Sequence, residues 1–179
     1  MFLTVMHAID DAVGGFFVTA RTPMRTTFFT AVTYGGNAEV VVGLFVIITL
    51  RFLYTKKYHS LGTFVRCLLV TGIIVYVAKL LFHRPRPLHA LILETDYSFP
   101  SGHAAIAVAL YGFIGYLLYK KYKHPTARFF IMLATLLIIL LIASSRLYLG
   151  VHYFSDIIAG IIVGTSSLLF FIRLQNKKS

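Results

Sequence analysis

The segment 127–145, ARFFIMLATLLIILLIASS, decides the fold class. Its one charged residue, Arg128, stands near the beginning, and an apolar run follows without interruption by another charge. About 20 apolar residues in an α-helix cross the hydrocarbon core of a bilayer, and this segment is close to that length. Because a helix satisfies its own backbone hydrogen bonds in lipid, the segment is predicted to be a transmembrane helix.

Four further stretches repeat this pattern and are too long to be buried strands. They are residues 38–54, 61–82, 103–119 and 155–172. Of the 179 residues, 58% are hydrophobic and 13% are charged, whereas soluble domains have roughly 45–50% apolar and about 25% charged residues. A soluble globule and a disordered chain are both excluded, since disorder needs low hydrophobicity. The chain is predicted to be an all-α, polytopic transmembrane bundle with five clear spans.

The N-terminal stretch 1–33 differs from these spans. Asp10 and Asp11 interrupt its apolar residues, and Arg21 and Arg25 follow. Two adjacent carboxylates in the middle of a bilayer would be costly. We therefore predict an interfacial amphipathic helix, a short hairpin or a short sixth span in this region.

The net charge of +11, from 17 Lys and Arg against 6 Asp and Glu, would suggest nucleic acid in a soluble protein. In a membrane protein it first indicates orientation, and no nucleic-acid partner is predicted. Ten cations follow the first, third and fifth spans, on one side of the membrane if the spans alternate: Arg51, Lys56, Lys57, Lys120, Lys121, Lys123, Arg128, Arg173, Lys177 and Lys178. The six acids lie at the other side: Asp10, Asp11, Glu39, Glu94, Asp96 and Asp156. Positive residues favour the cytoplasm, so the C-terminus is predicted to be cytoplasmic and residues 83–102 and 146–156 to face outward. The N-terminus would also be outside if the first segment does not span.

A smaller group of cations remains on the outer side, against the usual charge bias. Lys79 lies near the end of the second span, Arg84 and Arg86 alternate with prolines directly after it, and Arg146 ends the fourth span. Because proline ends helices, the Arg-Pro-Arg-Pro stretch is predicted to be a turn that presents both arginines at the membrane surface. For Arg84, contact with lipid headgroups is an equally good interpretation.

Residues 99–103, FPSGH, precede the third span on the same side. Ser101 is a good helix cap, and Gly102 lets the backbone approach a ligand closely. A helix N-terminus with free N–H groups attracts anions. With His103 in the first turn, the segment is predicted to be more than a cap.

Residues 145–156, SRLYLGVHYFSD, form a third polar block. His152 and Asp156 are four residues apart, so on a helix they would share one face and could hydrogen-bond. A carboxylate on one imidazole nitrogen fixes the tautomer and leaves the other as a nucleophile. The alternative is a polar pair that merely satisfies itself near a helix start.

All three blocks lie at the same end of their spans, where they can converge on one pocket. Cations, a helix N-terminus and two histidines favour a phosphoryl group, whose charge is spread over three oxygens. Two histidines and an aspartate could instead bind a metal ion, but Lys79, Arg86 and Arg146 would repel a divalent cation. The only cysteine, Cys67, provides neither a disulfide nor a metal cluster. No metal and no other cofactor is predicted.

The three blocks resemble those of the type-2 phosphatidic acid phosphatase family of membrane lipid phosphatases, whose pattern is K-x6-RP, PSGH and SR-x5-H-x3-D. The resemblance implies that His152 attacks phosphorus and forms a phosphohistidine, with Asp156 polarising it. It implies that His103 is the general acid. It also implies that the remaining matched residues bind the phosphoryl oxygens without a metal: Lys79, Arg86, Ser101, Gly102 and Arg146.

The chain is accordingly expected to be a single membrane-embedded phosphatase domain, 1–179, with an N-terminal segment, 1–37, and a catalytic core, 38–172. Members of the family commonly have six spans, so the N-terminal topology and the lipid entrance are where this chain departs. The family suggests phosphatidylglycerophosphate, undecaprenyl pyrophosphate, phosphatidic acid or lipid A 1-phosphate as substrate, and the short loop 88–99 favours broad specificity. The alternatives are a lipid phosphotransferase with the same intermediate and a non-enzymatic lipid-phosphate binding or transport protein.

Overall fold

A computed structural model describes residues 2–177, so Met1, Ser179 and Lys178 of the predicted C-terminal basic cluster lie outside it. This part of the chain is helical and contains no strand, which confirms the all-α prediction. The elements are α1 (Phe2–Thr19), α2 (Pro23–Thr33), a 3₁₀ turn η1 (Tyr34–Gly36), α3 (Ala38–Tyr54), α4 (Tyr58–Phe82), α5 (Gly102–Lys121), α6 (Pro125–Tyr148) and α7 (Phe154–Asn176).

The five predicted spans all correspond to helices. α4, α5, α6 and α7 are each long and apolar enough to cross a membrane. The fifth candidate span is broken, because α2 with η1 and α3 passes the same criteria only as a pair bent by 42°. The sequence prediction placed this first span at 38–54, which corresponds to α3 alone.

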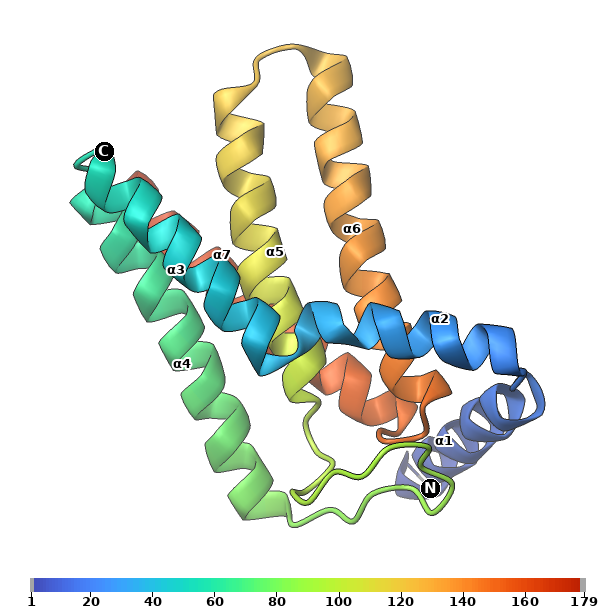
Figure 1. Ribbon diagram of the computed structural model, residues 1–179. Helices are drawn as coiled ribbons and strands as arrows, with labels where there is room; N and C mark the ends of the chain where they lie inside the picture. Colours follow the sequence, from blue (N-terminus) through green and yellow to red (C-terminus); the bar gives the residue numbers. More distant parts are fainter. Residues whose placement is uncertain (1, 178–179) are drawn as a thin grey trace.

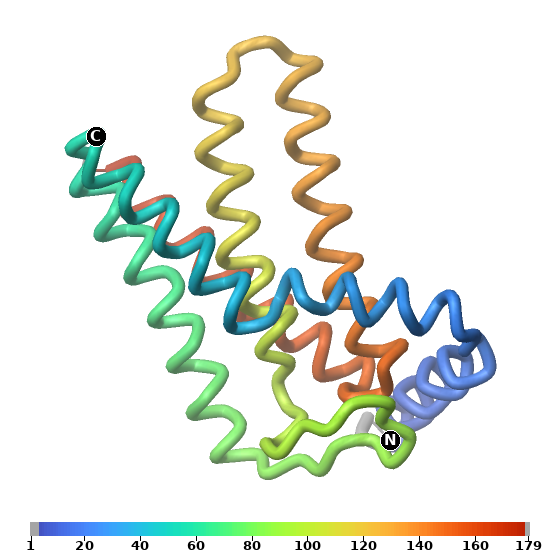
Figure 2. The backbone as a smooth tube through the Cα atoms, viewed as in Figure 1, coloured from blue at the N-terminus to red at the C-terminus, as the bar shows by residue number. Residues whose placement is uncertain are grey.

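The helices place the predicted charge groups at opposite ends of the bundle. α5 and α6 form an antiparallel pair, and their connection lies at the same end as the α3–α4 turn and the end of α7 (Figure 1). The long connection 83–101 runs along the opposite end, beside the turn before α7 (Figure 2). A backbone hydrogen bond of 2.8 Å from Leu91 N–H to the Leu149 carbonyl joins these two segments.

Small residues let α5 and α7 approach closely near this end. A Cβ atom on Gly160 would lie 2.5 Å from the Ser101 carbonyl oxygen, and one on Gly164 would lie 2.5 Å from that of Ala105. Small residues at such spacing allow helix backbones to meet inside membranes. The Ser101 N–H also donates to the Asp156 carbonyl at 3.0 Å. The packing therefore joins the start of α5 to the start of α7.

The N-terminal residues 2–33 form two helices, as expected for the hairpin alternative. Thr22 caps α2 by accepting from the Arg25 N–H at 3.3 Å, and Pro23 occupies the first helical turn. The Tyr148 hydroxyl, at the end of α6, accepts from the Thr22 N–H at 3.1 Å. Because Tyr148 is buried, this contact fixes the hairpin against the end of the bundle that carries the polar blocks.

Candidate active site

His152 lies in the turn between α6 and α7. The turn includes Gly150 at φ +71°, a conformation that side chains with a Cβ rarely adopt. α7 begins only at Phe154, so the expectation that His152 and Asp156 share a helix face is wrong. Instead, the Asp156 carboxylate turns back and accepts from the Tyr153 N–H at 2.9 Å, which caps the start of α7. The cap aims Asp156 at the turn that carries His152.

The two ring nitrogens of His152 have different neighbours. Nδ1 lies 3.4 Å from Asp156 Oδ2, and Nε2 lies 3.3 Å from Arg86 Nη1. Burial lowers the pKa of His152, Asp156 opposes this shift, and Arg86 adds to it. The imidazole is therefore neutral near pH 7. The carboxylate favours a proton on Nδ1, which leaves the Nε2 lone pair directed toward the cationic side of the site.

His103 occupies the first turn of α5. Its Nε2 atom lies 3.0 Å from Asn37 Oδ1, at the junction between η1 and α3. Gly36 makes this approach possible, since a Cβ there would lie 2.8 Å from His103 Cδ2. Asn37 was not among the predicted site residues, although Gly35-Gly36-Asn37 is a typical turn sequence between two apolar stretches.

The three predicted phosphate-binding cations come together through two carboxylates of the 83–101 connection. Asp96 accepts from Lys79 Nζ at 2.7 Å and also from Arg86. Glu94 pairs with Arg146 and lies 3.8 Å from Arg86 Nη2. From the sequence, both acids were predicted only to lie on this side of the membrane. Their pairing with the cations could not be predicted, because no periodic pattern relates loop residues to residues on the helices.

Arg146 is the most enclosed of these cations, with 1% of its surface exposed. Its Nη1 donates to the Thr33 hydroxyl at 2.8 Å, at the end of α2. A buried guanidinium is costly unless it is paired and hydrogen-bonded. Glu94 and Thr33 provide this pairing, so the position of Arg146 depends on the loop and on α2 together.

A cavity of about 470 Å³ connects most of the predicted site residues. Lys79, Arg86, Gly102, His103 and His152 line it, whereas Ser101, Arg146 and Asp156 lie behind its wall. Ser101 is buried and caps α5, accepting from the Ala104 N–H at 3.4 Å, and its own O–H is still able to donate.

The same cavity continues along the spans. Its apolar lining includes Val42 of α3, Gly72 and Tyr76 of α4, and Ile106 of α5. Gly72 precedes Lys79 by seven residues, which corresponds to about 10 Å of helix rise. The polar end of the cavity therefore opens into an apolar groove between α3 and α4.

Arg84 pairs with two carboxylates of neighbouring helices. Its Nη1 donates to Asp156 Oδ1 at 2.6 Å, and its Nη2 donates to Asp10 Oδ2 at 2.7 Å. Its guanidinium also lies 4.1 Å from the centre of the Tyr153 ring. Arg84 and Asp10 are thus additional residues beside the candidate site. Within residues 2–177, no three His, Cys, Asp or Glu side chains form a group that could hold a metal ion.

Known proteins are similar to this chain in sequence and in fold. The family model for the PAP2 superfamily matches residues 60–179. Phosphatidylglycerophosphatase B of Bacillus subtilis is 34% identical over 176 residues, 93% of this chain and 82% of that protein. An undecaprenyl-diphosphatase of Sulfolobus acidocaldarius is 30% identical over 136 residues, 72% of this chain and 61% of that protein. The crystal structure of a transmembrane PAP2-type phosphatidylglycerolphosphate phosphatase from Bacillus subtilis superimposes with a TM-score of 0.88 at 27% identity, covering 98% of this chain and 88% of that one.

Proposed function

The chain belongs to the PAP2 superfamily and is a membrane lipid phosphatase, and we propose that it works through a phosphohistidine on His152. The observation that carries this proposal is the cavity itself. His152, His103 and two cations share its polar end, and the groove between α3 and α4 extends from it into the spans. Phosphate chemistry at the end of an apolar groove suits a substrate that is a lipid.

In the first half-reaction, the Nε2 lone pair of His152 attacks phosphorus. A P–N bond forms, the P–O bond to the lipid breaks, and His103 gives its proton to the leaving oxygen. Asp156 stabilises the positive charge that develops on the imidazole. The 3.4 Å separation between Nδ1 and Asp156 Oδ2 supports this role.

In the second half-reaction, water replaces the lipid alcohol. His103, now neutral, accepts a proton from water while the water oxygen attacks phosphorus and the P–N bond breaks. Inorganic phosphate leaves, and both histidines return to their initial protonation states. The side-chain oxygen of Asn37, 3.0 Å from His103 Nε2, orients the His103 ring for both proton transfers.

The transferred phosphoryl group needs positive charge around its oxygens, and we assign this to the protein itself. Lys79, Arg86 and Arg146 provide it, with Ser101 O–H and the Gly102 N–H at the start of α5. These cations leave no role for a divalent ion, so the reaction is expected to be metal-independent.

The site lies at the end of the bundle opposite the basic clusters. By the positive-inside rule it faces the cell exterior, or the periplasm in a bacterial inner membrane, and the C-terminus is cytoplasmic. Phosphatidylglycerophosphate leads the candidate substrates because the Bacillus subtilis relative carries that activity in its name. Undecaprenyl pyrophosphate follows from the archaeal relative, and phosphatidic acid and lipid A 1-phosphate complete the set.

The test is phosphate release by the full chain in detergent, from each of these four lipids, with and without excess chelator. We expect release from at least one lipid and no effect of chelator. Loss of activity with chelator would contradict metal independence. Labelled phosphate transferred to an added lipid alcohol in place of water would identify a phosphotransferase, and binding without turnover would identify a transport or binding protein.

The pH dependence of kcat/KM should report the neutral state of His152. Burial and Arg86 lower its pKa below the usual 6.5, against the opposing effect of Asp156, so the nucleophile stays unprotonated through neutral pH. Activity should rise with pH along a limb whose midpoint lies below 6.5, and it should fall again at higher pH as His103 loses the proton that it gives to the leaving oxygen. The profile must be corrected for the ionisation of the substrate phosphate, measured separately by ³¹P NMR. A corrected midpoint at or above 6.5 would contradict a neutral nucleophile.

Asp96 pairs with two of the cations assigned to phosphate, so it should compete with bound phosphate. Its side chain is 54% exposed, and exposed ion pairs contribute up to about 1 kcal/mol. Asp96→Asn is therefore expected to lower the inhibition constant of inorganic phosphate up to about fivefold. Asp11→Asn removes the same charge from α1 and serves as the control. Weaker inhibition in Asp96→Asn would mean that Asp96 instead holds Lys79 and Arg86 in their binding positions.

A further inference from the structure

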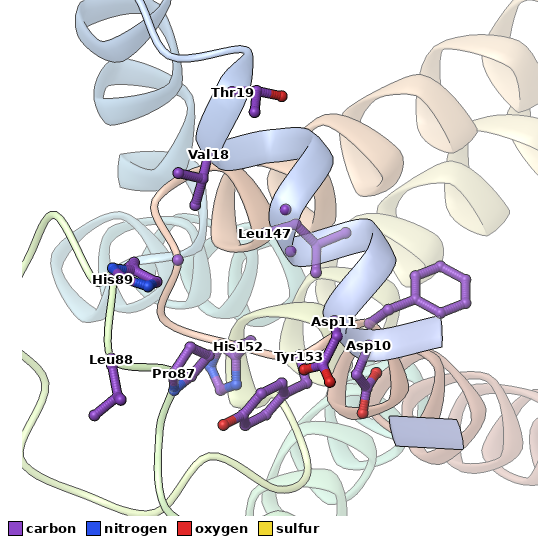
Figure 3. A pocket seen from close by; sticks show the side chains of 14 residues that line it. Asp10, Asp11, Val18, Thr19, Pro87, Leu88, His89, Leu147, His152 and Tyr153 are labelled. Carbon is purple, nitrogen blue, oxygen red and sulfur yellow. The ribbon is translucent and has the colours of Figure 1, made fainter. Parts of the chain in front are cut away.

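Asp10 is a buried carboxylate on a helix that is otherwise largely exposed. Only 2% of its surface is exposed, although its neighbour Asp11 on α1 is exposed. The two acids lie near Tyr153 and His152, with which they line a second cavity (Figure 3). A buried carboxylate is costly unless it is paired and hydrogen-bonded, so the partners of Asp10 indicate why it is there.

Asp10 accepts hydrogen bonds with both oxygens. Oδ1 accepts from the Ser155 N–H at 2.8 Å, and Oδ2 accepts from the Ser155 hydroxyl and from Arg84 Nη2, each at 2.7 Å. Burial alone would raise the pKa of Asp10, but the bonds from Ser155 and Arg84 hold it below its usual value. Asp10 therefore remains charged and joins α1 to the first turn of α7.

Arg84 continues this network to the candidate site. Its guanidinium bridges two carboxylates, with one arm on Asp10 and the other 2.6 Å from Asp156 Oδ1. The second oxygen of Asp156 faces His152 Nδ1. Because one cation is shared by two acids, Arg84 fixes Asp156 in place without neutralising the charge that faces His152.

We propose that Asp10 of α1 is a positioning residue of the phosphatase reaction: it holds Arg84 against Asp156 and offsets the charge of Arg84, so that Asp156 supports the nucleophile His152. This inference rests on the proposed role of His152. It makes α1 part of the catalytic unit, which supports treating residues 1–179 as one domain.

The charge balance around His152 predicts the direction of the effect. Asp156 from α7, Arg86 from the 83–101 connection, Arg146 from α6 and His103 from α5 all act on it. Tyr153, next to His152, feels the charges of Arg84 and of three acids, Asp10, Asp11 and Asp156. In Asp10→Asn the positive charge of Arg84 is no longer balanced by Asp10. This destabilises the protonated form of His152 and shifts the acid limb of kcat/KM to lower pH.

The experiment compares Asp10→Asn with Asp11→Asn in the full chain, using a lipid phosphate that the wild type hydrolyses. Asp11 has the same charge and lies on the same helix, but its side chain forms no hydrogen bond or ion pair with the rest of residues 2–177. Asp10→Asn is expected to lower kcat roughly tenfold, the lower end of the loss that follows when a residue supporting a functional histidine is changed. KM should stay within about twofold, because the side chain does not line the lipid groove, and the acid limb should move down by about one pH unit.

Two further variants separate charge from folding. Arg84→Gln should lower kcat and move the acid limb to higher pH, because the negative charges of Asp156, which faces His152, and of Asp10 behind it are then no longer balanced by a cation. The double variant Asp10→Asn/Arg84→Gln restores the net charge and should return the limb to its wild-type midpoint, with kcat still low. A lower kcat with an unmoved limb in both single variants would show a merely structural role and overturn the proposal. Equal behaviour of Asp10→Asn and Asp11→Asn would also overturn it. The proposed function itself would be overturned by a different result: no ³²P label on His152 when His103→Asn is quenched during turnover of a labelled phosphate ester.

Discussion

His152→Ala is expected to reduce release of phosphate from lipid by at least about 10³-fold. Removing a nucleophile that forms a covalent intermediate eliminates the reaction path, and only the effect of substrate binding remains. The position of the side chain explains the size of this effect. His152 lines the cavity, its Nε2 faces Arg86, and its Nδ1 faces Asp156, so the variant loses the nitrogen that is held between the cation and the carboxylate.

The control for this variant is His89→Ala. His89 lines the cavity that residues of α1 also line. Its backbone carbonyl accepts a hydrogen bond from Arg21 Nη2 at 2.7 Å, and its side chain is exposed. Its removal should leave activity near wild type. His152→Ala should still bind inorganic phosphate, because Lys79, Arg86 and Arg146 remain. Activity above a tenth of wild type in His152→Ala would contradict the assignment of His152 as the nucleophile.

His103→Asn is expected to have the second largest effect, and its size should depend on the leaving group. General acid catalysis contributes typically 10²–10⁴-fold when the leaving oxygen is a poor one, such as a lipid alcohol. A nitrophenyl phosphate needs no proton on its leaving group, so its first half-reaction should lose far less. The second half-reaction should still be slow, because no base remains to activate water.

These two effects combine into a burst. With nitrophenyl phosphate, His103→Asn should release about one equivalent of nitrophenol per enzyme rapidly and further product slowly. Stopped-flow absorbance measures the burst, and Asn37→Ala, which leaves His103 without its 3.0 Å contact, should show a weaker form of the same behaviour. An equal loss of rate for lipid phosphate and nitrophenyl phosphate, with no burst, would contradict the proposed role of His103 in proton transfer.

Hydropathy and length were sufficient to predict the spans. In lipid each helix satisfies its own backbone, so the apolar run alone reports the element, and the stretches at 61–82 and 103–119 correspond to α4 and α5 with only small changes at the ends. The break between α2 and α3 was not predicted. Its signals, Thr22-Pro23 as a helix start and Gly35-Gly36 as a turn, are local and weaker than the apolar runs beside them.

Convergence of the three motif blocks could also be predicted, because alternating spans bring corresponding ends together. The contacts that hold the blocks in position could not be predicted. Asp10 meets Ser155 from a distance of 145 residues, and Arg146 meets Thr33 from 113. Such pairs depend on how α1 and α2 fold back across the end of the bundle, which no periodicity in the sequence encodes. Arg84 illustrates the limit, since its side chain was equally compatible with lipid headgroups until Asp10 and Asp156 were placed on either side of it.

The most direct test of the account is to trap the covalent intermediate. His103→Asn is mixed with ³²P-labelled nitrophenyl phosphate and quenched within the burst, and the labelled protein is then treated with acid or base and digested for peptide mapping. We predict about one label per enzyme, labile in acid and stable in base, on the peptide that contains His152, and no label in His103→Asn/His152→Ala. Label on another residue, or full nitrophenol release without labelled protein, would contradict a phosphohistidine mechanism.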